Sequence, residues 1–457
     1  MKTEVKKDKG ILQGSLWRAI LRFAVPIAAG NMLQQLFNTA DVAIVGKFAG
    51  KEALAAVGSN GPIINLLLNL FIGISVGANV VIARYIGEGN SEKVKKAAHT
   101  AVSVALISGV IVMILGLVLS KPMLMMMNSP EDVIDLAALY LSIYFLGMPF
   151  MMVYNFSAAI LRSRGDTKRP LLCLVVSGAL NLILNIVLIL AFRAVGFDAS
   201  RGGVSAVAIA TVIANVVSAG MMVLFLTHEK GDLRIKLKEL KIDKRILVEF
   251  TRIGIPSGLQ GAVFSASNVF VQSSLNSLGS DFMAGSSAAL NCEFYVYHLA
   301  SGFSQATVTF VGQNYGAGNY RRCRSATKWC VLLALLTGGV LIGAMLLFRN
   351  SMVYLFTDEA NVAAIAAIRM LFILPFILVN NVSDILSGSM RGIGHSLVPA
   401  LITIAGVCGV RLIWIYTVFA NYPTFENLMV VYPISWVITF VGIFAAYLKL
   451  RKHVARN

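Results

Sequence analysis

The sequence contains little charge and few of the residues from which soluble active sites are built. Charged residues occupy only 13% of its 457 positions, and just 22 residues are acidic. With 57% hydrophobic residues, the chain is too apolar for an ordinary soluble globular domain. Its five Cys are scattered without metal-ligand or disulfide spacing, and there is no HExxH motif. We therefore expect no metal, no cofactor and no enzyme activity.

Long apolar runs are what the sequence does contain. Stretches of about 20 residues alternate with short polar segments, which is typical of membrane-spanning helices. We predict an all-α integral membrane protein with twelve transmembrane helices. The first run is longer than the apolar part of a signal peptide, so we expect it to be retained. The expected spans lie near residues 17–45, 54–83, 97–120, 133–161, 170–192, 203–227, 246–278, 283–313, 326–348, 360–390, 397–420 and 427–448.

Basic residues are concentrated on one side of this predicted topology. The N-terminal segment and every second segment after it hold 31 Lys and Arg, whereas the opposite loops hold only 6. Positive charge accumulates in cytoplasmic loops, so we expect both termini in the cytoplasm. The net charge of +17 then sets orientation, and we expect no nucleic acid as a partner.

The chain is duplicated, because features of its first part recur about 229 residues later. Six spans per copy is an even number, so both copies enter the membrane in the same direction. We expect two six-helix bundles related by a pseudo-two-fold axis along the membrane normal. The expected division is 1–227 for the N-terminal bundle, 228–245 for a cytoplasmic linker and 246–457 for the C-terminal bundle. For example, Gly87, Asn90 and Arg162 recur as Gly316, Asn319 and Arg391.

Two prolines occupy matching places in the two copies. Pro26 lies in the first span and Pro256 in the seventh. Proline removes a backbone hydrogen bond and bends a helix, and a membrane tolerates this only where other groups satisfy the freed carbonyl. We interpret both prolines as hinges, with a fixed kink as the alternative.

Polar side chains of the first copy follow helical spacing. Asn31, Gln34, Asn38 and Asp41 are separated by steps of three and four, which places them on one face of the first span. Polar groups within a membrane face a partner helix or a wet cavity, so this face is expected to line a polar interior. Other spans of this copy would contribute Asn65, Asn69, Asn181, Asn185 and Thr211.

Asp41 is the leading ionisable candidate. It lies 19 residues beyond Arg22, which corresponds to about 28 Å of helix. A charge at membrane depth costs at least about 2.5–3.5 kcal/mol on insertion scales. Burial disfavours the ionised form of a carboxylate, so this residue is suited to take up and release a proton. A structural Asp that is hydrogen-bonded to neighbouring Asn side chains is the alternative.

The second copy carries different polar groups, and Val271 stands at the position that corresponds to Asp41. Glu293 is the second ionisable candidate, with Arg411 as a candidate counter-ion. Asp384 is expected either to pair with Arg391 or to lie near the cytoplasmic interface. The residues predicted to line a substrate cavity are Gln34, Asn38, Asn65 and Asn69 of the first copy and Gln272, Glu293, Tyr297, Asn380 and Asp384 of the second.

Five strings of residues, in this order and spacing, carry a resemblance to a known family. The chain resembles the multidrug and toxic compound extrusion (MATE) transporters across essentially its whole length. The strings are PIAAGNMLQQLFNTADVAIVGKFAGKEALAAVG, GISVGANVVIARYIGEGN, AILRSRGDTKRP, GVSAVAIAT and FVGQNYGAGN.

This resemblance implies two six-helix bundles, alternating access, and export of cationic organic compounds driven by influx of H⁺ or Na⁺. Asp41 matches the acidic residue of the family's first helix and Pro26 its bend, while Asn181 and Thr211 match polar cavity positions. Two positions depart from the pattern. Many members carry Asp where this chain has Asn185, and another branch carries Glu where it has Phe264.

We therefore expect a cation-coupled antiporter, with H⁺ preferred over Na⁺, that exports cationic amphiphilic drugs and toxic organic compounds. The incoming cation and the organic cation would compete at Asp41, with Asn181, Asn185 and Thr211 beside it. Its expected partners are small organic cations and membrane lipid, and we expect a monomer. The alternative is a flippase for lipids or lipid-linked precursors, which would need a basic cavity for phosphate.

Overall fold

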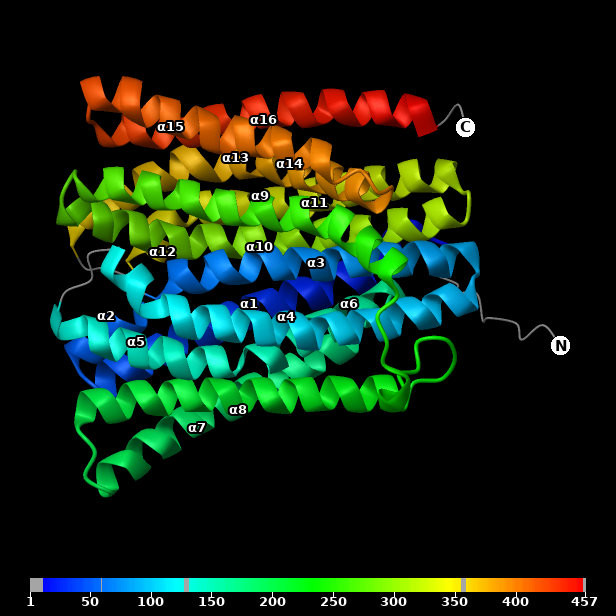
Figure 1. Ribbon diagram of the computed structural model, residues 1–457. Helices are drawn as coiled ribbons and strands as arrows, with labels where there is room; N and C mark the ends of the chain where they lie inside the picture. The colour runs from blue at the N-terminus through cyan, green and yellow to red at the C-terminus, as the bar shows by residue number, and fades with distance from the viewer. Residues whose placement is uncertain (1–10, 59, 127–130, 355–358, 455–457) are drawn as a thin grey trace. The chain divides into compact units, whose positions relative to one another are not determined.

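The computed structural model describes residues 11–58, 60–126, 131–354 and 359–454, and every regular element within these ranges is helical (Figure 1). The predicted all-α fold class is confirmed. In chain order the elements are α1 (Leu16–Phe48), α2 (Lys51–Gly58), α3 (Gly61–Glu88), α4 (Ser91–Met126), α5 (Glu131–Leu146), α6 (Met148–Ser163), α7 (Lys168–Ala194), α8 (Ala199–Thr227), η1 (Leu237–Glu239), α9 (Lys244–Asn276), α10 (Ser280–Gly316), α11 (Tyr320–Leu347), α12 (Arg349–Val353), α13 (Ala360–Gly392), α14 (Leu397–Thr403), η2 (Ile404–Gly409), α15 (Val410–Trp414), η3 (Ile415–Phe419) and α16 (Phe425–Val454).

The long helices account for the twelve expected spans. Within the described residues, eight spans are long and apolar enough to cross a membrane, and the bent pair α5–α6 makes a ninth. The remaining three expected spans are α1, α9 and α10, with 33, 33 and 37 residues. These three are less apolar because they carry many of the polar side chains that the sequence analysis singled out.

The span expected at 133–161 is broken in its middle. Helices α5 and α6 meet at an angle of 49°, with Gly147 between them. Pro149 stands in the first turn of α6, where its missing N–H costs no helical hydrogen bond and its ring does not clash with a preceding turn. The span expected at 54–83 also differs, because α2 ends at Gly58 and α3 begins only at Gly61.

The chain forms two compact units that do not follow its order. The C-terminal unit comprises Met1–Ala29, Gly87–Gly89 and Leu259–Asn457, and the N-terminal unit comprises Gly30–Ile86 and Asn90–Gly258. The first part of α1 thus belongs to the C-terminal unit, and the first part of α9 belongs to the N-terminal unit. The divisions fall shortly after Pro26 in α1 and Pro256 in α9. The expected boundaries of the two repeats stay a prediction.

Aromatic packing anchors the first part of α1 in the C-terminal unit. Phe23 meets Phe310 of α10 edge to face, with ring centroids 5.6 Å apart. Ile20, Ala24 and Ile27 are buried in the same apolar cluster, and their spacing of three and four residues gives α1 one apolar face. This face accounts for the placement of the segment before Pro26.

Glycines anchor the first part of α9 in the N-terminal unit. A Cβ atom on Gly73 of α3 would lie 2.3 Å from the Gly258 backbone nitrogen, and one on Gly77 would lie 2.2 Å from the Phe250 carbonyl oxygen. Residues without side chains let helix backbones approach closely where lipid gives no hydrophobic drive for association. A larger residue cannot enter this crossing without moving a helix.

We expect Gly73→Val to lower the midpoint of thermal unfolding of the purified protein by several degrees, because overpacking costs about 1–3 kcal/mol. Gly220→Val is the matched control, since no heavy atom lies within 4 Å of a Cβ at Gly220. Differential scanning fluorimetry in detergent compares the two variants. Equal midpoints would show that α3 and α9 do not depend on this close approach.

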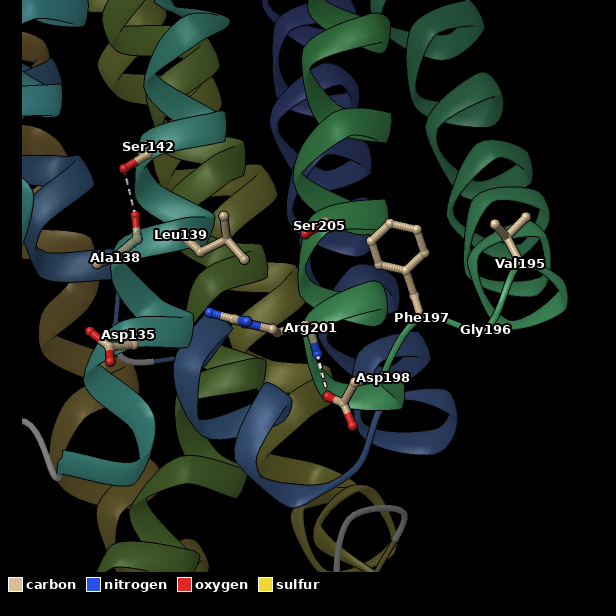
Figure 2. A pocket seen from close by; sticks show the side chains of 10 residues that line it. All are labelled: Asp135, Ala138, Leu139, Ser142, Val195, Gly196, Phe197, Asp198, Arg201 and Ser205. Atoms are coloured by element: carbon tan, nitrogen blue, oxygen red, sulfur yellow. Dashed lines mark hydrogen bonds between the residues drawn. The ribbon is translucent and has the colours of Figure 1, made fainter.

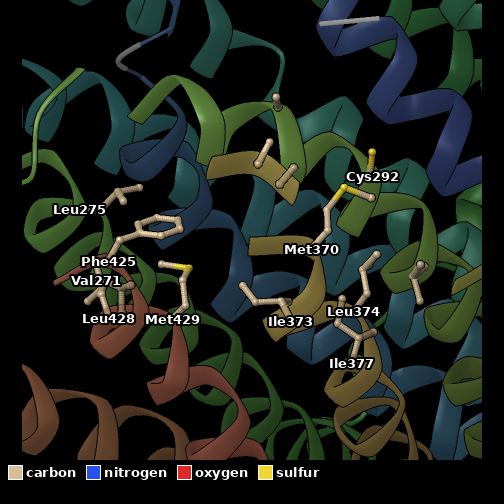
Figure 3. Packing of buried hydrophobic residues seen from close by; sticks show 14 of the residues in the cluster. Val271, Leu275, Cys292, Met370, Ile373, Leu374, Ile377, Phe425, Leu428 and Met429 are labelled. Atoms are coloured by element: carbon tan, nitrogen blue, oxygen red, sulfur yellow. The ribbon is translucent and has the colours of Figure 1, made fainter. Parts of the chain in front are cut away.

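The core of the C-terminal unit lies on α9, α10, α13 and α16 (Figure 3). Met370, Ile373, Leu374 and Ile377 recur at helical spacing along α13 and are almost fully buried. They form one cluster with apolar residues of the other three helices, among them Val271, Leu275, Cys292, Leu428 and Met429. This cluster fixes the helices that carry the buried charges of the unit.

The eleventh span is irregular in a way that periodicity did not predict. The α-helical turns α14 and α15 alternate with two π-helical segments, η2 and η3. π-Helical turns are rare, and they are frequent at functional sites. The short helix α15 carries Arg411, which is completely buried.

The linker expected at 228–245 contains only the three-residue 3₁₀ turn η1 before α9 begins. Its backbone is tied to α4, because Lys236 N donates to His99 Nε2 at 3.2 Å and Asp243 N donates to Thr100 Oγ1 at 3.1 Å. The linker is thereby held along the N-terminal unit.

Candidate functional site

Asp41 of α1 lies against the polar faces of α7 and α8 in the N-terminal unit. Asn185 Nδ2 donates to Asp41 Oδ1 at 2.6 Å, and Asn181 Nδ2 donates to Thr211 Oγ1 at 3.3 Å. If the Asn181 amide is turned over, its nitrogen lies 2.7 Å from Asp41 Oδ1. The structure thus brings together all four residues predicted to bind the coupling ion. Their role in coupling stays a prediction.

The local structure explains this convergence. Asn181 and Asn185 are one turn apart on α7, so both amides point from the same face of the helix. Helices α7 and α8 pack along each other (Figure 1), which brings Thr211 of α8 to Asn181. The Thr211 hydroxyl also donates to Val207 O at 2.9 Å, which fixes its rotamer.

The electrostatic setting of Asp41 is unusual for a carboxylate at membrane depth. Its hydrogen bonds come from amides, and no Lys, Arg or His among the described residues forms an ion pair with it. Asn185 is completely buried, and its Oδ1 atom has no hydrogen-bond partner in this part of the chain. The carboxylate can accept a proton, and together with the unsatisfied amide oxygen it can bind a small cation.

Two tyrosines of α5 belong to the same compact unit as Asp41. Tyr140 and Tyr144 stack with ring centroids 5.8 Å apart and an interplanar angle of 20°. Neither tyrosine was among the predicted site residues, although their i, i+4 spacing was visible in the sequence. Their ring faces are suited to an organic cation.

The remaining polar residues predicted on the N-terminal unit are accessible. Gln34, Asn38 and Asn65 are exposed, and Asn69 is half-buried. The exposure of these side chains agrees with the prediction that they line a water-filled cavity. Their contact with a substrate stays a prediction.

In the C-terminal unit, Glu293 of α10 forms a buried, two-pronged ion pair with Arg369 of α13. Arg369 Nε lies 2.7 Å from Glu293 Oε1, and Arg369 Nη2 lies 3.0 Å from Oε2. Both residues are less than a tenth exposed. The sequence analysis did not consider Arg369, although an arginine inside a long apolar span was the available signal. Glu293 is therefore already neutralised by its own unit.

The counter-ion suggested for Glu293 was wrong. Arg411 Nη1 donates to Asn268 Oδ1 at 2.7 Å, and Arg411 Nε lies 3.4 Å from Ser435 Oγ. Both partners are neutral. Glu293 is not available to Arg411, because Arg369 already binds both oxygens of its carboxylate. Asp384 was expected to pair with Arg391 or to lie near the cytoplasmic interface, and within the described chain the two residues form no ion pair.

The other cavity residues predicted on the C-terminal unit differ in their exposure and in their hydrogen-bond partners. Gln272 is exposed and donates to Asn276 Oδ1 at 2.8 Å. Tyr297 is 43% exposed. Asn380 and Asp384 are half-buried, and the Asp384 backbone oxygen accepts a hydrogen bond from Ser304 Oγ at 3.0 Å. Within the described part of the chain no hydrogen bond or ion pair joins Gln272, Tyr297, Asn380 and Asp384 to one another, and their role in lining a substrate cavity stays a prediction.

A hollow of about 920 Å³ opens between the start of α5 and the α7–α8 connection, within the N-terminal unit (Figure 2). Asp198 caps α8 there by accepting hydrogen bonds from Ser200 N and Arg201 N, both at 3.1 Å. The residues that line the hollow are Asp135, Ala138, Leu139, Ser142, Val195, Gly196, Phe197, Asp198, Arg201 and Ser205. No predicted site residue lines this hollow, so it is separate from the Asp41 cluster.

Within the described residues no cluster of three or more His, Cys, Asp or Glu side chains could hold a metal ion.

Comparison with known proteins decides the family. A family model described as MatE matches residues 26–187 and again residues 256–417, one match in each copy of the repeat. The chain belongs to the MATE family. The resemblance found in the sequence is thereby confirmed, and the duplication that the residue landmarks indicated agrees with the two matches.

Two relatives of this MATE protein match it over most of its length. It is 30% identical over 439 residues to a probable multidrug resistance protein, YoeA, of Bacillus subtilis, covering 95% of this chain and 94% of that protein. It is 29% identical over 400 residues to a probable multidrug resistance protein, NorM, of Thermotoga maritima, covering 86% and 84%.

Solved structures have the same fold. A crystal structure of MATE in complex with MaL6 superposes with a TM-score of 0.89 at 24% identity, covering 98% of this chain and 99% of that one. A MOP superfamily transporter from Pyrococcus furiosus, described as having a binding pocket of reverse polarity, superposes with a TM-score of 0.85 at 24% identity. Both likenesses support the two-lobed, twelve-helix membrane fold.

MATE proteins are transporters, and the chain is accordingly not an enzyme. Residues 73–77 read GISVG, which matches the Gly-x-Ser-x-Gly pattern of hydrolases. That pattern requires a sharp strand-to-helix turn, whereas here it lies inside α3, and the Ser75 hydroxyl donates to Ile72 O at 2.7 Å.

Proposed function

We propose that this MATE protein is a cation-coupled antiporter that exports cationic amphiphilic drugs and toxic organic compounds from the bacterial cytoplasm. The relatives named as multidrug resistance proteins support multidrug efflux as the activity. The 31-to-6 distribution of basic residues supports a multi-pass inner-membrane protein with both termini in the cytoplasm. We propose that it acts as a monomer.

The observation that carries this proposal is Asp41, a carboxylate at membrane depth whose hydrogen-bond donors are amides. No basic side chain among the described residues neutralises it. By contrast, Glu293 is held by Arg369. Asp41 is therefore a carboxylate at which an inorganic cation and an organic cation can replace one another. A proton needs only one oxygen, which is why we prefer H⁺ over Na⁺.

Competition at one carboxylate is enough to couple two opposite flows. Each ligand stabilises the conformation in which it binds, so the proton favours one state and the organic cation the other. One charge that moves down a potential of 100 mV releases about 2.3 kcal/mol. Asn181, Asn185 and Thr211 would orient the carboxylate, and the stacked rings of Tyr140 and Tyr144 would hold the organic cation by cation–π contact.

We propose that the switch between states uses Pro26 and Pro256 as hinges. The chain passes from one compact unit to the other shortly after each of these prolines. The part of α1 before Pro26 belongs to the C-terminal unit and the part that follows to the N-terminal unit, while α9 passes from the N-terminal to the C-terminal unit shortly after Pro256. A change of backbone conformation at either proline therefore alters the path of a continuous helix.

Transport by the purified protein in liposomes tests this proposal. We expect ethidium uptake into vesicles to follow an imposed pH gradient and to stop when an ionophore collapses it. Transport driven by a Na⁺ gradient alone, at equal pH on both sides, would show that Na⁺ is the coupling ion. No ethidium movement under either gradient would contradict the antiporter function.

A lipid flippase is the second candidate, and one observation favours it. Arg369 and Arg411 are both buried in the C-terminal unit, and guanidinium groups suit phosphate. The same vesicles, prepared with a fluorescently labelled phospholipid, distinguish the two functions. A flippase would move the label between leaflets at rates that ethidium does not change.

A further inference from the structure

Two exposed arginines stand at the edge of a groove in the C-terminal unit. The groove lies between α11, α13 and α16, and its lining includes Arg324 of α11 and Arg451 of α16, which are both exposed. Ile393, Tyr447 and Leu450 also line it and are half-buried. The groove therefore combines two positive charges with largely apolar walls.

The polar atoms in the floor of the groove are already paired. The floor is formed by the buried residues Val311, Cys323 and Ser389. Ser389 Oγ lies 2.8 Å from Thr327 Oγ1, and Cys323 Sγ donates to the Val311 carbonyl oxygen at 3.6 Å. The enclosed space is about 40 Å³, which is room for only a few water molecules. A larger ligand therefore has to bind at the exposed edge, where the arginines lie.

No carboxylate of the surrounding chain neutralises the two arginines. Neither Arg324 nor Arg451 forms an ion pair among the described residues. The stretches that supply all the lining residues contain no acidic residue; these are 309–357, 385–425 and 427–457. Two like charges at one groove repel each other, so an anion between them is favoured.

The first copy of the repeat, by contrast, pairs its basic residues with its own carboxylates. Lys95 stands 229 residues before Arg324, and its Nζ atom lies 2.7 Å from Glu239 Oε2. Arg164 Nη1 likewise lies 3.1 Å from Glu229 Oε1. The position of Lys95 and Arg324 is thus basic in both copies, but only the first copy supplies a counter-charge. In the second copy the counter-charge is left to a group outside the chain.

An aromatic stripe leads along α16 away from Arg451. Steps of four, three and four residues place four side chains on one face of this helix, namely Phe440, Phe444, Tyr447 and Arg451. The rings of Phe440 and Phe444 stack with centroids 5.6 Å apart, and Phe444 is 43% exposed. A cation at the end of a span, followed by accessible apolar rings along the span, matches the order of phosphate and acyl chain in a phospholipid.

We propose that this groove binds one anionic phospholipid of the cytoplasmic leaflet. The phosphate lies between Arg324 and Arg451, and an acyl chain follows the stripe through Tyr447 and Phe444. Basic pockets between transmembrane helices on the cytoplasmic side suit anionic headgroups. The bound lipid supplies the missing counter-charge and connects α11 to α16. This inference goes beyond the antiporter activity and needs only the proposed orientation, with the C-terminus in the cytoplasm.

Two lipids with the same acyl chains test the proposal. Phosphatidylglycerol has a net negative charge, whereas phosphatidylcholine has none. Native mass spectrometry of the purified full-length protein measures the affinity for the first bound lipid of each kind. We expect the wild type to bind phosphatidylglycerol about tenfold or more tightly than phosphatidylcholine, because each basic residue near the lipid adds to the attraction. The double variant Arg324→Gln with Arg451→Gln should bind the two lipids equally.

A second double variant separates a specific groove from a generally basic surface. Arg321→Gln with Lys449→Gln removes the same number of charges from the same two helices, and both residues are exposed but do not line the groove. We expect this control to change the affinity for phosphatidylglycerol by less than about threefold. Equal weakening in the two double variants would assign the effect to general surface charge and overturn the proposal. Equal binding of the two lipids by the wild type would overturn it without any variant.

The acyl-chain part of the proposal has its own test. Phe444→Ser should weaken phosphatidylglycerol binding, whereas Val441→Ser, which changes an exposed residue on another face of α16, should not. Equal affinities of these two variants would contradict the stripe. Displacement of phosphatidylglycerol by glycerol phosphate at the same concentration would identify a site for soluble anions and overturn the proposal. Equal binding of both lipids with intact ethidium transport would refute this inference only, and loss of transport with selective lipid binding would refute the proposed function only.

Discussion

Asp41→Asn is expected to abolish gradient-driven export. The substitution keeps the size of the side chain and removes its charge, so neither a proton nor an organic cation gains from binding there. A hydrogen bond to a charged group contributes about 1.5–3 kcal/mol, and each 1.4 kcal/mol is a factor of about 10 in affinity. We therefore expect cationic substrates to bind about 10- to 100-fold more weakly. Coupling should be lost entirely, because no titrating group remains at the site.

Ethidium efflux from cells, followed by fluorescence, measures this effect for the wild type and the variant. Asp135→Asn is the matched control, since Asp135 is an exposed carboxylate of the same unit that pairs with Lys121 at 3.0 Å. The control should export ethidium at the wild-type rate. Equal efflux by Asp41→Asn and the wild type, at equal amounts in the membrane, would remove Asp41 from the coupling mechanism.

Glu293→Gln is expected to destabilise the C-terminal unit strongly. The substitution leaves the Arg369 guanidinium buried without a counter-charge, and breaking a buried pair in this way costs about 3–5 kcal/mol. Replacing both partners with neutral side chains, as in Glu293→Gln with Arg369→Met, should recover most of this loss because no uncompensated charge remains. Unfolding by heat or by SDS in mixed micelles measures the midpoints.

Glu426→Gln is the control for this series, because Glu426 is an exposed carboxylate at the start of α16 in the same unit. Its midpoint should stay at the wild-type value. The series also separates two roles for Glu293. A variant that keeps its stability but loses transport would make Glu293 a substrate or ion site, against the structural role that its pairing with Arg369 supports.

Asp41 and Glu293 are thus expected to respond differently to the same chemical change. Asp41 has amide partners and is expected to affect transport, whereas Glu293 has a guanidinium partner and is expected to affect stability. The sequence placed both at membrane depth and favoured Asp41, but it did not reveal the partner of either carboxylate. The difference depends on which helix faces each carboxylate, and that is a property of packing.

The membrane class, the spans and the duplication could all be predicted from the amino-acid sequence. Apolar length and polar punctuation follow directly from the thickness of the bilayer, and a repeat can be recognised without any contact being known. The polar stripe through Asn38 and Asp41 also followed, because helical periodicity is local. The same local argument predicted that Asn181 and Asn185 share a face of α7, and the structure agrees.

The partners of the charged residues and the composition of the compact units could not be predicted in this way, because both depend on how the helices pack. Arg369, not Arg411, holds Glu293, because an ion pair between α10 and α13 depends on the rotation of two helices about their axes. The exchange of the first parts of α1 and α9 between units depends on glycine and phenylalanine contacts between segments far apart in the chain. Hydropathy and periodicity describe one helix at a time, whereas these features arise from the way helices pack.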